Sequence, residues 1–124
     1  MKRISKQLLD GNVETLILAV LQAGPSYGYA IAKELHARSK GILVLGEGTL
    51  YPVLHRLEER GLIAAKWRLA DNGRRRKYYR LSPKGRRALA LNREQWEALA
   101  DAMRRVLRPA GRVRSTPAFK GATL

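Results

Sequence analysis

The side chains in this sequence with the clearest chemistry are cations gathered in one short stretch. From Lys66 to Lys84 the chain carries eight basic residues and one acidic residue, and Trp67, Tyr78 and Tyr79 lie among them. A basic stretch interleaved with aromatic rings is typical of a surface that binds nucleic acid, because the cations neutralise phosphates. The sequence therefore predicts a phosphate-binding segment here.

Four of these cations are consecutive. The run consists of Arg74, Arg75, Arg76 and Lys77. It has no acidic neighbour in the sequence, so the four charges repel one another unless phosphates neutralise them. We expect some of the four to contact phosphate; the alternative is a solvated loop that only keeps the protein soluble.

The sequence lacks the arrangements that catalysis or metal binding would need. His36 and His55 stand alone, and no His or Glu pair has the spacing of a metal site. No nucleophile has a recognisable base, and the residues around Gly48 lack the Walker pattern. We expect no enzymatic activity, no metal and no cofactor.

The charge balance also indicates a nucleic-acid partner. The chain has 124 residues, with 25 Lys and Arg against 10 Asp and Glu, and a formal net charge of +15. Residues 1–60 carry 8 basic and 6 acidic side chains, whereas residues 61–124 carry 17 and 4. Such a local excess predicts a polyanionic partner, nucleic acid first and an anionic membrane surface second.

Length and apolar content predict one small folded protein. The sequence is 45% hydrophobic and contains no cysteine, so the core or association must hold the fold rather than disulfides. The longest uninterrupted apolar run, Leu16–Leu21, is far too short to span a membrane. We expect a soluble, cytoplasmic protein with no membrane contact.

The first half of the chain has helical spacing. Apolar residues recur at the period of a half-buried helix from Val13 to Leu21. A second helix is expected to follow Ser26 as its N-cap and to end at Gly41. The apolar residues Ile42–Leu45 predict a short strand after it.

A third helix is expected to begin near Thr49, with Pro52 in its first turn, and to end at Gly61. Its apolar stripe consists of Leu50, Val53, Leu54 and Leu57. The opposite face presents Thr49, Pro52, His55, Arg56 and Glu59.

The period changes to two after this helix. Apolar and polar residues alternate from Ile63 to Leu69 and again from Lys77 to Leu81. The pair Asn72-Gly73 between these runs is a turn signal, so a β-hairpin is expected. Ser82-Pro83 then starts a last helix that ends near Leu107.

The last helix has a coiled-coil repeat. Residues spaced 3, 4, 3, 4 and 3 apart are Leu89, Asn92, Trp96, Leu99, Met103 and Val106. About two and a half heptads are enough to pack on a partner helix, which predicts a homodimer interface with Asn92 fixing its register. The sequence after Pro109 has no periodicity, so residues 109–124 are expected to form a disordered basic tail.

The order of these elements predicts the fold class. It is mainly α with a small β-hairpin wing: a winged helix-turn-helix followed by a long C-terminal dimerisation helix. The expected domains are a DNA-binding domain over residues 1–82 and a dimerisation helix over residues 83–108. In such a fold the third helix enters the major groove and the hairpin lies along phosphates.

Three motifs in this order carry a family resemblance. They are Tyr27-Gly28-Tyr29-Ala30-Ile31; Gly48-Thr49-Leu50-Tyr51-Pro52-Val53-Leu54 with Arg56-Leu57-Glu58 and Gly61-Leu62-Ile63; and Arg76-Lys77-Tyr78-Tyr79-Arg80-Leu81. Over roughly Leu8–Leu107 the chain resembles the PadR family of bacterial transcriptional regulators, and its single last helix resembles the short subclass. The resemblance implies a dimeric winged-helix repressor that binds an inverted-repeat operator and, in several members, is released by an effector.

The start of the third helix is expected to contact double-stranded DNA. The residues that we assign to this contact are Thr49, Pro52, His55 and Arg56. The alternative is a solvated face on which Arg56 pairs with Glu59. Two alternatives are equally open for Tyr51, a phosphate contact through its hydroxyl and a half-buried packing role.

Three other aromatic residues have candidate roles. Tyr27 and Tyr29 start the second helix, where free N–H groups favour a phosphate, although one of the two rings is expected in the core. Trp96 is expected in the dimer core. The resemblance adds a sharper hypothesis, in which two Trp96 rings sandwich a small, flat aromatic effector.

Two other functions remain open. A winged helix could instead bind structured RNA or coat DNA without sequence preference. The helical seam from Leu89 to Val106 could also join a different protein rather than a second copy of this chain.

Overall fold

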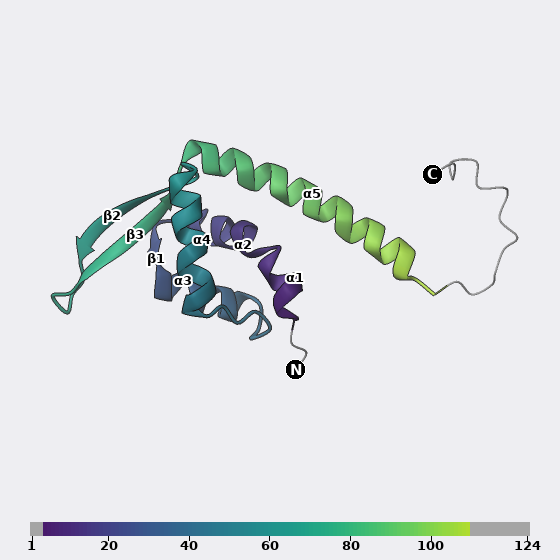
Figure 1. The fold of residues 1–124 in the computed structure, drawn as a ribbon, viewed down its shortest axis with the longest axis horizontal. Helices are drawn as coiled ribbons and strands as arrows, with labels where there is room; N and C mark the ends of the chain where they lie inside the picture. The colour runs from purple at the N-terminus through teal and green to yellow at the C-terminus, as the bar shows by residue number, and fades with distance from the viewer. Residues whose placement is uncertain (1–3, 110–124) are drawn as a thin grey trace, which may run out of the picture. The chain divides into compact units, whose positions relative to one another are not determined.

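The computed structural model describes residues 4–109, in which helices and strands follow one another as Figure 1 shows. In chain order the elements are α1 (Lys6–Asp10), α2 (Val13–Leu21), β1 (Ser26–Tyr27), α3 (Gly28–Arg38), α4 (Glu47–Glu59), β2 (Ile63–Leu69), β3 (Arg75–Leu81) and α5 (Pro83–Leu107). The predicted fold class is confirmed, since a small hairpin and one long helix follow a set of helices. The described chain forms two compact units, and their boundary after Glu94 lies within α5.

The core of the first unit lies between α2, α3 and α4. Ile17, Ile31 and Leu54, one from each helix, are completely buried in the same cluster. Ile63 and Tyr79 of the sheet belong to this cluster too. Because a fully buried aliphatic side chain contributes about 1.5–3 kcal/mol, these contacts are the main force that holds the three helices against the sheet.

The sheet is antiparallel, with the strand order β1-β3-β2. Strands β2 and β3 form a hairpin, called the wing below, which projects from the helices in Figure 1. Its turn holds Gly73 at a φ of 81°, a left-handed conformation that glycine adopts readily. The N–H of Arg74 donates to Oδ1 of Asn72 at 3.0 Å, so the predicted Asn-Gly turn is confirmed.

Strand β1 corrects the prediction that Ser26 caps the second helix. Ser26 pairs with Tyr79 and Tyr27 pairs with Tyr78, so both residues are extended. Helix α3 begins at Gly28, and its N-cap Tyr27 makes no side-chain capping bond. The edge of β3 offers backbone partners to this segment, which satisfies its N–H and C=O groups outside a helix.

The predicted strand at Ile42–Leu45 is wrong, because these residues form a loop. The N–H of Leu43 donates to Oγ of Ser39 at 2.9 Å, which fixes the loop after α3. Strand β3 already has β1 on one side and β2 on the other. Leu45 packs against the helical core instead of joining the sheet.

The bounds of α4 differ in part from the prediction. The helix begins at Glu47, with Gly46 as N-cap, and not at Thr49. Pro52 therefore lies in the second turn rather than the first, where its missing N–H removes one intrahelical bond. The end is as predicted, because Gly61 follows the last turn with a φ of 74°.

Helices α1 and α3 differ from the sequence-based boundaries as well. Helix α3 ends at Arg38 rather than near Gly41. Helix α1 was not predicted, since five residues carry too little periodicity to be recognised. The hydroxyl of Ser5 caps it by accepting from the Leu8 N–H at 3.2 Å.

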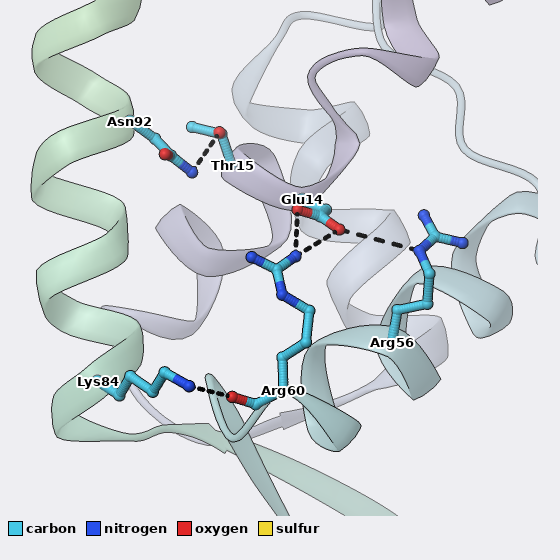
Figure 2. A network of polar contacts seen from close by, with 6 residues as sticks. All are labelled: Glu14, Thr15, Arg56, Arg60, Lys84 and Asn92. Atoms are coloured by element: carbon cyan, nitrogen blue, oxygen red, sulfur yellow. Dashed lines mark hydrogen bonds and ion pairs between the residues drawn. The ribbon is translucent and has the colours of Figure 1, made fainter.

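The first turn of α5 is fastened to the end of α4. The Ser82 hydroxyl donates to the Gly61 carbonyl at 2.6 Å and accepts from the Gly85 N–H at 3.0 Å. The ammonium group of Lys84 donates to the Arg60 carbonyl at 2.8 Å, as Figure 2 shows. The helix start predicted at Ser82-Pro83 is confirmed, and its capping groups also hold the neighbouring helix end.

Gly85 brings α5 against the start of the wing. A Cβ atom at this position would overlap the carbonyl oxygen of Leu62 and crowd the side chain of Leu81. The two backbones therefore touch directly, and only glycine permits that approach.

The heptad residues of α5 fall into two groups. Leu89 is 1% exposed and belongs to the core of the first unit, which corrects the prediction that it lies in a dimer seam. Nδ2 of Asn92 donates to Oγ1 of Thr15 at 3.1 Å within the chain, as Figure 2 shows. In the second unit the exposed seam residues are Trp96, Leu99, Met103 and Val106.

No helix between residues 4 and 109 has the length and apolar character that crossing a membrane requires. The tail predicted for residues 109–124 lies outside the described residues apart from Pro109. The domain boundary expected after residue 82 lies at the start of α5, whereas the two compact units divide after Glu94.

Candidate nucleic-acid interface

Helix α4 presents the residues that the sequence assigns to DNA contact. Its apolar stripe is buried as predicted and consists of Leu50, Val53, Leu54 and Leu57. The opposite side is exposed at Tyr51, Pro52, His55 and Arg56, and Thr49 is half-buried. Helix α4 is therefore amphipathic, with the apolar stripe inside and the predicted contact residues on the outer side.

Most of the predicted site residues gather in one cleft between α4, the start of α3 and the wing. Its volume is about 540 Å³. It is lined by Tyr27, Gly28, Tyr29, Tyr51, His55, Trp67, Arg75, Arg76, Lys77 and Tyr79. Aromatic rings and cations from β1, α3, α4 and both strands of the wing thus converge although they lie far apart in the sequence.

The structure does not bring every predicted residue into this cleft. Thr49, Pro52 and Arg56 line a separate hollow of about 260 Å³, beside α1. Arg74 is exposed in the wing turn. The candidate interface therefore has two parts on α4, one at the wing and one at α1.

The two tyrosines at the start of α3 have different surroundings. Tyr29 is 65% exposed at the mouth of the cleft. Tyr27 is half-buried, and its ring meets the Tyr78 ring edge-on with 5.4 Å between centroids. Neither ring is in the buried core, so the expectation that one of them packs there is wrong.

Tyr51 is exposed, although its ring packs against the start of α3. A Cβ at Gly28 would lie 2.7 Å from the Tyr51 hydroxyl, so the ring lies directly across the glycine backbone. The ring still keeps 38% of its surface exposed. The Tyr51 ring therefore makes a packing contact with α3, as one of the two alternatives predicts. Its hydroxyl group also lies at the cleft.

Three wing arginines lie over aromatic rings. The guanidinium carbon of Arg76 is 4.4 Å from the centroid of the Tyr27 ring. The corresponding distance is 5.5 Å from Arg75 to Trp67 and 5.1 Å from Arg68 to Tyr78. Cation–π attraction of this kind is worth about 0.5–1 kcal/mol at exposed sites.

Lys77 differs from the other cations of its run because it has an acidic partner. Its ammonium group donates to Oε1 of Glu58 on α4 at 3.0 Å. This hydrogen bond raises the pKa of Lys77 above its ordinary value. The sequence places no acidic residue beside the run from Arg74 to Lys77. In the folded protein Glu58 lies next to Lys77, so the inference that the run has no acidic neighbour is wrong.

Tyr79 lies beneath this ion pair. The Lys77 ammonium group is 5.4 Å from the centroid of the Tyr79 ring. Burial raises the pKa of the Tyr79 phenol, because the phenolate would lose its hydration there. Lys77, Glu58 and Tyr79 therefore join the base of the wing to the end of α4.

Arg56 pairs with a residue that the sequence did not suggest. Its Nε is 3.9 Å from Oε1 of Glu14 on α2, and it has no ion pair with Glu59 among the described residues. Figure 2 shows that Arg60 approaches the same carboxylate, with Nη1 at 3.1 and 3.0 Å from its two oxygens. Glu14 thus pairs with one cation within α4 and with the C-cap residue that follows the helix.

Sequence reasoning missed the acidic members of this interface. Glu14 comes from a helix that carried no motif, and Glu58 stood in a motif without being assigned a partner. The signal available was only the surplus of cations, which must be balanced where the chain folds them together. Among residues 4–109 no cluster of three His, Cys, Asp or Glu side chains could hold a metal ion.

Comparison with known proteins agrees with this arrangement. The family model described as transcriptional regulator PadR-like family matches residues 17–91. A transcriptional regulator from Clostridium thermocellum has a similar structure, with a TM-score of 0.77 and 33% identity over 85% of this chain and 99% of that chain. A PadR family transcriptional regulator from Eggerthella lenta gives 0.73 and 35% over 84% and 88%.

Among curated proteins, the transcriptional regulator Rv3488 of Mycobacterium tuberculosis is 53% identical over 53 residues, which are 43% of this chain and 49% of that protein. The matched family and these named relatives are transcriptional regulators rather than enzymes, as the sequence predicts. The family match spans more than half of the chain and includes α3, α4 and the wing. The chain belongs to the PadR-like family of transcriptional regulators.

Proposed function

We propose that the chain is a cytoplasmic repressor that binds an inverted-repeat DNA operator as a homodimer. Helix α4 of each subunit enters a major groove, and the wing lies on the adjacent phosphates. The observation that carries the proposal is the cleft between α4 and the wing, which exposed Tyr51 and His55 line together with Trp67 and Arg75. The α5 helices join the subunits, so half-sites lie about 34 Å apart.

The wing cations have different roles in the proposed contact with DNA phosphates. Arg74, Arg75 and Arg76 have no carboxylate within 4.0 Å among the described residues, whereas Lys77 is held by Glu58. The three arginines therefore supply the phosphate contacts of the run, and Lys77 supports the wing.

The experiment is a footprint combined with a salt titration. DNA from upstream of the protein's own gene is compared with random duplex at about 0.15 M salt. About four phosphates neutralised per subunit give a slope of about −7 for log affinity against log salt. A palindromic protected site supports the regulator. Uniform affinity for random duplex or a slope near −1 contradicts it.

A charge variant locates the contact. Arg75→Gln removes one proposed phosphate contact from each subunit and is expected to reduce the magnitude of the salt slope by about 2 per dimer. Lys40→Gln removes the same charge from an exposed position that does not line the cleft. The control is expected to keep the slope of the parent protein.

The proposed effector is a small, flat aromatic molecule held between the two Trp96 rings of the dimer. The 52% exposure of Trp96 supports this role, because the ring has a free face for a ligand. Planar aromatic cations are expected to quench the tryptophan fluorescence of the parent protein. Equal quenching in Trp96→Ala would assign the signal to Trp67 and would contradict the effector hypothesis.

A further inference from the structure

Three arginines of the wing share a feature that phosphate binding alone does not require. Each guanidinium of the pairs Arg75/Trp67, Arg76/Tyr27 and Arg68/Tyr78 lies over an aromatic ring, at distances of 5.5, 4.4 and 5.1 Å from the centroid. None of the three arginines has a carboxylate within 4.0 Å among residues 4–109. Their position is therefore set by rings instead of by ion pairs.

The pairs lie on both faces of the wing. Residues opposite one another in an antiparallel pair share a face, and successive residues alternate. The register Trp67 opposite Lys77 places Trp67 and Arg75 on the face that carries buried Tyr79. The register Arg68 opposite Arg76 places the other two pairs on the opposite face, with Tyr27 brought there by its pairing with Tyr78.

An aromatic partner leaves the N–H donors of arginine available. The guanidinium carries five N–H donors, and a carboxylate partner would occupy two of them. An aromatic ring attracts the cation through its π system and has no carboxylate oxygen to occupy these donors. An arginine held in this way loses less side-chain freedom when it binds a phosphate.

We propose that Trp67, Tyr27 and Tyr78 are positioning residues for phosphate binding. They act through Arg75, Arg76 and Arg68 by holding each guanidinium in place before DNA arrives. The proposal rests on the proposed function, because it assumes that the wing arginines contact DNA. Trp67 is a suitable test case, since 55% of its surface is exposed and its loss leaves the core intact.

A double-mutant cycle tests the Arg75/Trp67 pair. Trp67→Leu is expected to weaken operator binding about two- to fivefold per subunit, as the loss of one exposed cation–π contact would. The same substitution in an Arg75→Gln protein is expected to have little further effect, because the group that the ring orients is gone. A ring that contacts DNA by itself, or that only supports the fold, would cost the same in both backgrounds.

The Tyr27 pair gives an independent measurement. Tyr27→Leu is expected to bind the operator about two- to fivefold less tightly per subunit, whereas Tyr27→Phe keeps the ring and is expected to lose clearly less affinity than Tyr27→Leu. Equal losses in both variants would assign the effect to the hydroxyl group and overturn the positioning role. Thermal unfolding of each variant, compared with the parent, identifies any loss that comes from the fold.

Failure of the two proposals can be told apart. If Arg75→Gln alone leaves operator affinity and salt slope unchanged, Arg75 does not contact phosphate, and both its part in the proposed function and the positioning role of Trp67 fail. If Arg75→Gln weakens binding but the effect of Trp67→Leu simply adds to it, only the positioning role is overturned.

Discussion

Glu14 is placed to restrain a cation of the proposed DNA-reading helix. Its carboxylate lies 3.9 Å from Arg56 and holds Arg60 with both oxygens. A phosphate that approaches Arg56 must compete with this carboxylate, which also repels the phosphate. The residue that organises the end of α4 therefore also lowers its affinity for a polyanion.

Removing this charge is expected to strengthen DNA binding. We expect Glu14→Gln to raise operator affinity about two- to fivefold at low salt, with the gain lost as salt screens the charges. Fluorescence anisotropy with labelled operator measures it. Glu34→Gln is the matched control, because Glu34 forms a similar exposed pair with Arg38 on α3. An equal gain in the control would mean that only net charge matters.

The Lys77 and Tyr79 pair predicts how stability depends on pH. Both groups have a pKa raised in the folded protein, Lys77 by its hydrogen bond to Glu58 and Tyr79 by burial. A raised folded pKa means that stability is fully present below the unfolded value, roughly 10, and is lost as the pH rises through the folded value. The free energy of unfolding in urea is thus expected to stay level from about pH 7 to 9 and then fall.

Tyr79→Phe checks this assignment, because it removes the phenol whose ionisation burial opposes. Its free energy of unfolding is expected to fall less steeply above about pH 10 than that of the parent. Tyr29→Phe removes an exposed phenol and is expected to keep the parent's slope. Identical slopes in all three proteins would rule out Tyr79 as a source of the alkaline loss.

Residue-level prediction from the sequence succeeded where spacing along one element decides the outcome. Thr49, His55 and Arg56 were assigned to the outer side of α4 because a helical period fixes which side is apolar. It failed for Lys77, whose partner Glu58 is nineteen positions away. Contacts of that kind depend on how elements pack, and no local pattern encodes them.

At the level of elements, the joint between α5 and the wing depends on one glycine. Gly85→Ala is expected to destabilise the protein by about 1–3 kcal/mol, because its Cβ would overlap the Leu62 carbonyl and force the backbones apart. Gly48→Ala is the control, since that helical position has open space around it and alanine favours a helix by up to about 1 kcal/mol. Urea unfolding at pH 7 measures both. If both substitutions changed the free energy of unfolding equally, the close approach of Gly85 to Leu62 would be excluded as the cause.

Elements with strong periodicity were predicted closely, and short ones were not. Helix α2, strand β2 and the long helix α5 each have a repeat long enough to show their period. Strand β1 is two residues long and exists because the edge of β3 is free to pair with it. Such a strand is decided by tertiary structure, as is the loop over Ile42–Leu45, where Leu45 packs against the helical core.

At the level of the whole molecule, dimerisation is tested on the exposed seam of α5. Leu99→Glu places a charge among the proposed contacts and is expected to convert the dimer to a monomer in sedimentation equilibrium. Leu91→Glu changes a similarly exposed leucine of the same helix outside the heptad seam and is expected to leave the dimer intact. A monomeric parent protein, or a dimer that survives Leu99→Glu, would contradict the proposed assembly.

The fastening of α5 bears on how an operator is selected. Its first turn touches the Leu62 backbone with no side chain between them, and Lys84 holds the Arg60 carbonyl. Backbones in such direct contact cannot move independently. We therefore expect α4, the wing and the start of α5 to move as one rigid body. In the proposed dimer, we expect that bending at this joint does not accommodate an operator with a longer or shorter spacer. The joint would then discriminate between spacer lengths without contacting a single base.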